Sequence, residues 1–204
     1  MKKVKCCITI TVLVIVILSN VTNVSALKLG GKLIKGPRNM TYTVNGGAAA
    51  YTNNINGAAY NWMYTGYDNP IYMTPVSSLN GSVVDFYSYY ITYPEELLAG
   101  TIFFDEQSVE MNTTDRYRTE DWLYAEIHLN DVYKDDYSIN HYVVAAHEIG
   151  HALGLDENPN RYSIMCQFHD WVAVDKPQYI DSEEVVEIYG RYWWKDLVWF
   201  LLLV

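Results

Sequence analysis

The sequence predicts an α+β fold, in which helices pack against a mixed β-sheet. Two observations support this prediction. Short segments rich in β-branched and aromatic residues, which are typical of strands, occupy much of the chain before residue 131. Helical segments stand before and after most of these strands and do not alternate with them regularly. With 204 residues, the chain is long enough for one domain with a substantial core.

Five segments are expected to be strands, because each is short and rich in Val, Ile, Thr, Phe or Tyr. They are residues 40–44, 71–76, 83–91, 100–105 and 124–130. The last of them alternates apolar and polar residues cleanly, which is typical of a strand buried on one face. The polar segment 106–121 is expected to be mostly loop.

Three segments are expected to be helices: residues 48–64, 141–153 and 183–192. Apolar side chains recur at helical spacing in the first, at Ile55, Ala58, Ala59 and Trp62. Ser138 or Asn140 can cap the second helix, and Gly154 is expected to end it. Asp181 and Ser182 are expected to cap the last helix, whose first acidic residues suit the positive end of the helix dipole.

Residues 1–26 have the three parts of a secretory signal peptide. Basic residues begin the segment, at Lys2, Lys3 and Lys5. An apolar run follows at residues 8–18, and Val24-Ser25-Ala26 offers a cleavage site of small residues. The run is shorter than the roughly 20 residues of a membrane span. We therefore expect cleavage after Ala26 and a secreted, extracellular protein without a transmembrane span.

Composition narrows the choice of partner. The chain has 24 acidic and 14 basic side chains and a net charge of −10 at pH 7. This excess of negative charge argues against nucleic acid as a partner. Two of the three cysteines lie in the expected signal, so Cys166 would be the single cysteine of the processed chain and no internal disulfide could form.

The strongest functional signal is His147-Glu148-Ile149-Gly150-His151. Two histidines four positions apart in a helix lie on the same face, one turn apart, and can bind one metal ion. Glu148 follows the first of them and can act as a general base toward water at that ion. A helical HExxH sequence is typical of zinc hydrolases.

A third metal ligand is expected where the chain returns after the helix. Gly154 allows an abrupt stop, and Glu157 follows it by three positions. The neighbouring Asp156 is an alternative ligand. A second alternative is a glutamate of the last helix, Glu183 or Glu187, but this arrangement would leave Gly154 and Met165 without a role.

This segment, followed by Ser163-Ile164-Met165, resembles the metzincin pattern HExxHxxGxxH with its Met-turn, and most closely the matrixin branch. Three further segments are similar to matrixin elements, at residues 58–62, 100–104 and 125–130. The chain departs from the matrixin pattern at Glu157, where matrixins generally have histidine. Two histidines and a glutamate are nevertheless an established catalytic zinc set.

The resemblance implies a metzincin-like fold: a twisted mixed sheet backed by helices, an active-site helix, a Met-turn and a small C-terminal subdomain with a last helix. The expected division is a signal at 1–26, a catalytic domain at 27–192 and an apolar tail at 193–204. The implied cofactor is Zn²⁺. Aspartates in the loop before the active-site helix could also hold a structural Ca²⁺, or could form an ordinary solvated loop: Asp131, Asp135 and Asp136.

The expected function is that of a secreted zinc endopeptidase, in which His147, His151 and Glu157 bind the metal and Glu148 is the catalytic base. An extended peptide would bind along the strand at residues 100–105. The main alternative is an inactive metzincin scaffold used for binding or adhesion. The chain is expected to be a monomer, and its tail could either pack on the domain or attach it to a surface.

Overall fold

The structure is a computed structural model that describes residues 28–92, 97–111, 120–167 and 172–191. The expected signal segment and the apolar C-terminal tail lie outside the described residues. Among the residues that are described, no helix is both long and apolar enough to cross a membrane.

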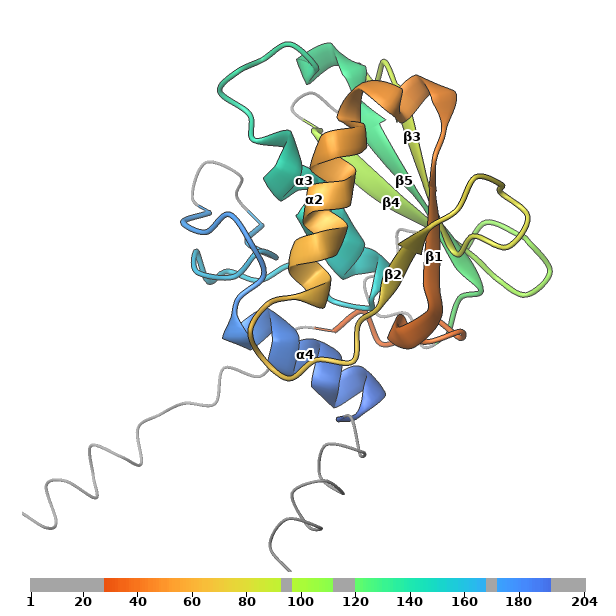
Figure 1. The fold of residues 1–204 in the computed structure, drawn as a ribbon, viewed down its shortest axis with the longest axis vertical. Helices are drawn as coiled ribbons and strands as arrows, with labels where there is room; N and C mark the ends of the chain where they lie inside the picture. Colours follow the sequence, from red (N-terminus) through yellow and green to blue (C-terminus); the bar gives the residue numbers. More distant parts are fainter. Residues whose placement is uncertain (1–27, 93–96, 112–119, 168–171, 192–204) are drawn as a thin grey trace, which may run out of the picture.

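A five-stranded sheet forms the centre of the fold, with the strand order β2-β1-β3-β5-β4 (Figure 1). Its strands are β1 (Met40–Val44), β2 (Met73–Pro75), β3 (Val84–Tyr89), β4 (Ala99–Phe104) and β5 (Tyr124–Asn130). The pairs β1–β2, β1–β3 and β3–β5 are parallel, whereas β4 runs antiparallel to β5. The sheet is mixed, as predicted, and its reversed strand lies at an edge.

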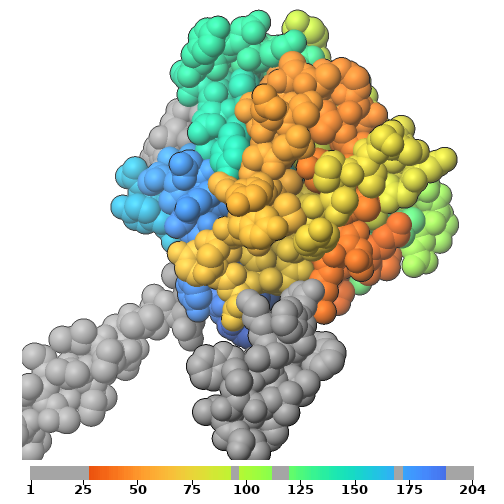
Figure 2. Space-filling model, viewed as in Figure 1, coloured from red at the N-terminus to blue at the C-terminus, as the bar shows by residue number. Residues whose placement is uncertain are grey.

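Two helices, α2 (Thr52–Met63) and α3 (His141–Ala152), pack against each other beside the sheet (Figure 1). The indole nitrogen of Trp62 donates a hydrogen bond of 2.8 Å to the carbonyl oxygen of Ala146, which fixes one helix against the other. In the same view, α2 and the chain after it form much of the surface (Figure 2). The large side chains of the core come from both layers: Ile55, Trp62, Phe86, Ile127 and Ile149.

The helix expected at residues 48–64 begins later than predicted. Residues Gly46–Tyr51 form a 3₁₀-helix, and the α-helix starts at Thr52. The predicted apolar face is correct, because Ile55, Ala58, Ala59 and Trp62 are all buried. Two other 3₁₀-helices, Pro37–Asn39 and Asp131–Tyr133, are short connections.

The prediction for the start of the last helix was wrong by a few residues. The helix α4 spans Tyr179–Tyr189, and its N-cap is Gln178. Asp181 lies inside the first turn, where its carboxylate accepts a hydrogen bond of 2.7 Å from the backbone nitrogen of Gln178. The acidic residue therefore completes a capping box from within the helix instead of preceding it.

Candidate metal centre

The histidine pair lies on α3. Of the two residues expected to cap this helix, Ser138 and Asn140, the N-cap is Asn140. The Asn140 side chain accepts a hydrogen bond from the backbone nitrogen of Tyr142. One helical turn separates His147 from His151, and their ring centroids are 4.7 Å apart. Both rings therefore face the same side of the helix, as the spacing predicted.

Each imidazole is oriented by a backbone carbonyl group. The Nδ1 atom of His147 lies 3.0 Å from the carbonyl oxygen of Ile164, and that of His151 lies 2.9 Å from the carbonyl oxygen of Leu155. A carbonyl oxygen only accepts hydrogen bonds, so both Nδ1 atoms carry the proton. With Nδ1 engaged in this way, Nε2 is the atom of each ring that would bind a metal, in the neutral form of the imidazole.

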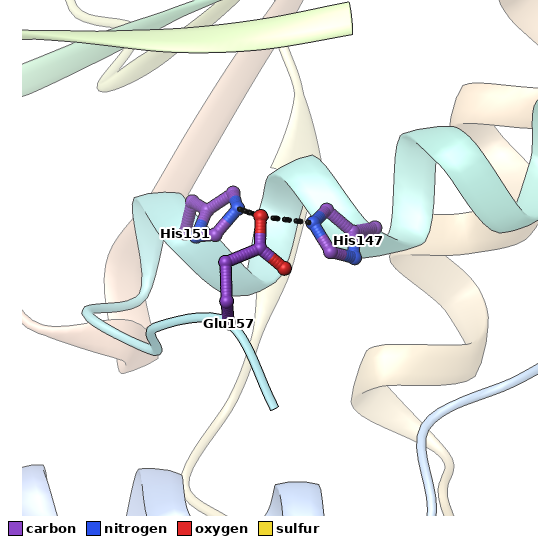
Figure 3. A group of neighbouring side chains, drawn as sticks. All are labelled: His147, His151 and Glu157. Atoms are coloured by element: carbon purple, nitrogen blue, oxygen red, sulfur yellow. Dashed lines mark ion pairs between the residues drawn. The ribbon is translucent and has the colours of Figure 1, made fainter. Parts of the chain in front are cut away.

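Glu157 reaches the histidines because the chain turns sharply after α3. Gly154 has a φ of 97°, in the left-handed region where a side chain is strained. The Oε1 atom of Glu157 lies 3.6 Å from Nε2 of His147 and 3.6 Å from Nε2 of His151. Figure 3 shows the carboxylate pointing between the two rings. These three side chains are the one group of potential metal ligands that converges within the described residues.

The alternative ligands have other contacts. Asp156 accepts a hydrogen bond of 2.8 Å from the backbone nitrogen of Glu157, so it stabilises the turn that carries its neighbour. On α4, Glu183 forms an ion pair with Arg191, and Glu187 forms one with Lys28. None of these three carboxylates belongs to the converging group.

The geometry and chemistry of the group suit zinc. Ligands about 2.0–2.2 Å from a tetrahedral ion are about 3.4 Å apart, close to the nitrogen–oxygen separations found here. The second carboxylate oxygen of Glu157 is buried and makes no hydrogen bond to the described residues. A cation bound between this half-buried carboxylate and the two imidazoles would satisfy the buried oxygen atom.

The charges of the three side chains depend on one another. Burial lowers the pKa of His151, but the carboxylates of Glu157 and Glu148 outweigh this effect and raise the pKa to about 9. Burial also disfavours the charged form of Glu157, yet the two imidazoles hold the pKa of its carboxyl group well below the ordinary value. The pocket therefore stabilises an ionised third ligand.

Glu148 lies beside the group, 6% exposed, and has a partner that the sequence did not indicate. The hydroxyl group of Thr101, on β4, lies 2.7 Å from Oε2 of Glu148. Thr101 and Glu148 are 47 positions apart in the sequence, so no local spacing rule could predict their contact.

The Met-turn packs closely beneath the histidine pair. A Cβ atom placed on Gly150 would lie 2.2 Å from the sulfur atom of Met165, so a larger residue there would displace the Met165 side chain. Met165 is completely buried. Gly150 lies in the last turn of α3, and a glycine within a helix was the available sequence signal for such a close approach.

A helix far along the chain holds this turn in place. The fully buried carboxylate of Asp181 accepts hydrogen bonds from the Ser163 hydroxyl and from the backbone nitrogen of Ile164. The carbonyl oxygen of Ile164 is the partner of His147. The last helix is thus connected to a candidate metal ligand through a single residue of the turn.

A cavity of about 200 Å³ opens next to the candidate ligands. Its lining combines His147, Glu148 and Glu157 with apolar side chains. These apolar residues are Leu97, Leu98, Ala99, Val143, Val144, Ile164 and Val172. Cys166 and Gln167 complete the wall. The cavity places an apolar recess directly beside the carboxylate and imidazole groups.

The expected calcium site finds no support in the described residues. Asp131 accepts hydrogen bonds from the hydroxyl groups of Tyr51 and Ser88, and Asp136 accepts them from Ser138. Neither these residues nor Asp135 belong to a converging ligand group. Asp131 and Asp136 form hydrogen bonds within the fold instead.

Comparison with known proteins decides the family. The family model described as Matrixin, of the peptidase M10 group, matches residues 88–190. The chain belongs to the matrixin family. The predicted metzincin-like fold is therefore confirmed, and the matched region contains β4, β5, α3 and α4. Members of this family are zinc metalloendopeptidases.

A curated matrixin resembles part of the chain. Human matrix metalloproteinase-15 is 42% identical over 53 residues, which is 25% of this chain and 8% of that protein. The match thus covers a small part of the longer matrixin. Glu157 remains the main departure from the family pattern of three histidines.

Proposed function

We propose that this matrixin is a secreted zinc-dependent endopeptidase that hydrolyses internal peptide bonds of extended substrates. The observation that carries the proposal is the convergence of His147, His151 and Glu157 beside the buried carboxylate of Glu148 and an apolar cavity. Two histidines and one glutamate leave a position open for water, as a catalytic zinc site requires.

The reaction needs little more than these side chains. A zinc ion held by the three ligands would lower the pKa of a water molecule and polarise the scissile carbonyl group. Glu148 accepts the proton of the attacking water and then delivers it to the departing amine. His147 and His151 keep their orientation because their Nδ1 atoms donate to backbone carbonyl groups.

The edge strand β4 supports binding of an extended peptide. In an antiparallel pair, alternate residues direct both backbone groups toward the partner strand. The hydrogen bond from Asn130 to the carbonyl oxygen of Leu98 shows that even-numbered residues face β5. Ala99 and Thr101 therefore direct their backbone groups to the outer edge of the sheet, where no described strand pairs with them and a substrate backbone could pair. The adjacent apolar cavity suits an uncharged, apolar substrate side chain.

Secretion is part of the proposal and rests on the signal-like segment at residues 1–26. A monomer is proposed as well, since one chain supplies all the groups named above. The apolar segment at 193–204 is proposed to associate with the domain or with a surface.

Zinc analysis combined with a cleavage assay tests the proposal. The purified processed chain should contain about one zinc ion and should cleave casein or members of a peptide library. Glu148→Gln should retain zinc and lose at least about 100-fold in kcat, because a general base contributes at least that much. Glu126→Gln is the matched control, since Glu126 pairs with His128 on β5, away from the candidate ligands.

Each contrary result has a distinct meaning. Zinc binding without cleavage of any substrate would favour the alternative, a metzincin scaffold that serves binding or adhesion. Retained cleavage in Glu148→Gln would remove the proposed base. Failure to bind zinc in metal-replete preparations would overturn the proposed function as a whole.

A further inference from the structure

We propose that Thr101 is a positioning residue for catalysis: its hydroxyl group holds the Glu148 carboxylate in its working orientation and couples that orientation to substrate binding. This inference rests on the proposed function, because it concerns the residue assigned as general base. Thr101 itself contributes no proton to the reaction. It acts through Glu148.

The first argument is the hydrogen bond itself. The Oγ1 atom of Thr101 lies 2.7 Å from Oε2 of Glu148 and 3.3 Å from the carbonyl oxygen of the same residue. A hydroxyl group has one proton to donate, and the nearer, charged oxygen is the stronger acceptor. Donation to Oε2 restricts rotation of the carboxylate and leaves Oε1 available for the attacking water.

The second argument is burial. Glu148 is only 6% exposed, so few partners other than the Thr101 hydroxyl group can reach its carboxylate. A buried carboxylate that loses a hydrogen-bond donor either reorients toward other donors or draws in water. Either change moves the oxygen atoms of the base, and displacement of a reacting group by about 1 Å can cost about 100-fold in rate.

The third argument is the position of Thr101 on the strand. Odd-numbered residues of β4 turn their side chains toward the helices, as the buried neighbours Ala99 and Phe103 show. Their backbone groups point away from β5, and Phe103 uses its outward carbonyl oxygen to accept a hydrogen bond from Met111. Thr101 thus offers its backbone to the substrate edge and its side chain to Glu148.

Thr101 therefore takes part both in the edge that would bind substrate and in the contact that orients Glu148. A peptide that pairs with the open edge would hydrogen-bond with the backbone of Thr101 and restrain the strand at this point. The same restraint would fix the hydroxyl group that holds the carboxylate. Pairing of substrate and orientation of the base would then occur together, without movement of α3.

Three variants test this role. Thr101→Val removes the hydroxyl group and preserves the shape of the side chain, whereas Thr101→Ser retains the hydroxyl group. Thr43→Val is the matched control, because the buried Thr43 hydroxyl donates a 2.7 Å hydrogen bond to the carboxylate of Asp85, away from the candidate ligands. Zinc content, thermal unfolding and the separate values of kcat and KM are measured for each.

We expect Thr101→Val to lose about 10- to 100-fold in kcat, with KM changed less than about twofold and zinc content unchanged. Thr101→Ser should recover most of the loss. Thr43→Val should keep kcat even if its unfolding temperature falls by as much as that of Thr101→Val. This pattern separates orientation of the base from a general effect on stability.

The inference is overturned if Thr101→Val keeps the wild-type kcat, if Thr101→Ser is as slow as Thr101→Val, or if Thr43→Val is equally slow. Should Thr101→Val fail to fold, the comparison of Thr101→Ala with Thr101→Ser decides in the same way. A double-mutant cycle of Thr101→Val and Glu148→Gln on chemical unfolding adds a readout independent of activity, and zero coupling would also overturn it. A wild-type chain without zinc or cleavage would instead refute the proposed function.

Discussion

At the scale of single residues, the third ligand position distinguishes this chain. Glu157 brings a negative charge where matrixins generally have a neutral imidazole. The neighbouring imidazoles of His147 and His151 stabilise its ionised form, against the effect of burial. The charge partly neutralises a bound zinc ion. We expect a somewhat weaker Lewis acid than one held by three histidines, with the same open coordination position.

Removing that carboxylate tests the ligand assignment. Glu157→Ala should lower zinc affinity by at least about 100-fold. Loss of a group that only orients a ligand can cost that much, and loss of a residue that binds the metal directly should cost at least as much. Asp156→Ala should lower it much less, since Asp156 contacts only the backbone of the turn in the described structure. Zinc affinity is measured by competition with a coloured chelator. A larger loss in Asp156→Ala would mean that the assigned ligand is wrong by one position.

The residues of the centre differ in how far the sequence could predict them. His147, Glu148 and His151 follow one local spacing rule, and the structure brings the two histidines together with Glu157, as expected. Their assignment as ligands and base stays a prediction. Thr101 and the carbonyl group of Ile164 could not be predicted, because their partners come from other elements through tertiary packing.

At the scale of elements, the described centre depends on the contact between α4 and the Met-turn. The carboxylate of Asp181 accepts a hydrogen bond from the backbone nitrogen of Ile164, and the carbonyl group of Ile164 in turn orients His147. Because these hydrogen bonds share one residue, we expect a change in α4 to affect the orientation of His147, a candidate ligand. The position of α4 is thereby linked to the geometry of α3.

Asp181→Asn tests this connection. The amide nitrogen cannot accept a hydrogen bond, so the side chain cannot accept from Ser163, Ile164 and Gln178 together, and we expect zinc affinity to fall by about 10-fold. The unfolding temperature should fall as well, since the site is completely buried. Glu183→Gln on the same helix is the control, because Glu183 pairs with Arg191 at the surface. Unchanged zinc affinity in a destabilised Asp181→Asn would show that α4 supports the fold alone.

Predictions of elements succeeded where the signal was local. All five expected strands exist, and the alternating segment Tyr124–Asn130 has the predicted bounds. Element ends were less accurate, because capping depends on which partner is near. Asp181 resembles an N-cap residue in sequence, but a hydrogen bond to Gln178 moves the helix start before it.

At the scale of the whole molecule, this acidic chain buries a glutamate, Glu184, close to its candidate metal centre. Glu184 is 1% exposed, and its Oε1 atom accepts a hydrogen bond of 3.2 Å from Asn158, the residue after Glu157. Burial, followed by the charge of Asp181, raises the pKa of Glu184 to about 8. At neutral pH the folded protein therefore keeps this carboxyl group mostly protonated.

This protonation makes stability depend on pH. Between about 4.5, the ordinary pKa, and about 8, the folded state binds more protons at Glu184 than the unfolded state. The contribution of this group to stability therefore falls as pH rises through that window. Glu184→Gln removes the dependence, so the variant should gain up to a few kcal/mol relative to wild type between pH 5 and pH 8.5.

Chemical unfolding at both pH values measures this gain, with saturating zinc in each sample. Glu187→Gln is the control, because Glu187 lies on the same helix as Glu184 and forms a surface ion pair with Lys28. A constant difference between wild type and Glu184→Gln across the window would show that Glu184 is ionised in the folded protein.

The sequence separation of the contacts has a consequence for the order in which the protein matures. The three converging side chains lie between His147 and Glu157, so a short stretch of a newly made chain can gather them early. The hydroxyl partner of Glu148 lies 47 positions away and arrives only when the edge strand has docked. Metal capture should therefore precede competence for hydrolysis, and a partly folded chain that already holds its ion would be spared from digesting its neighbours.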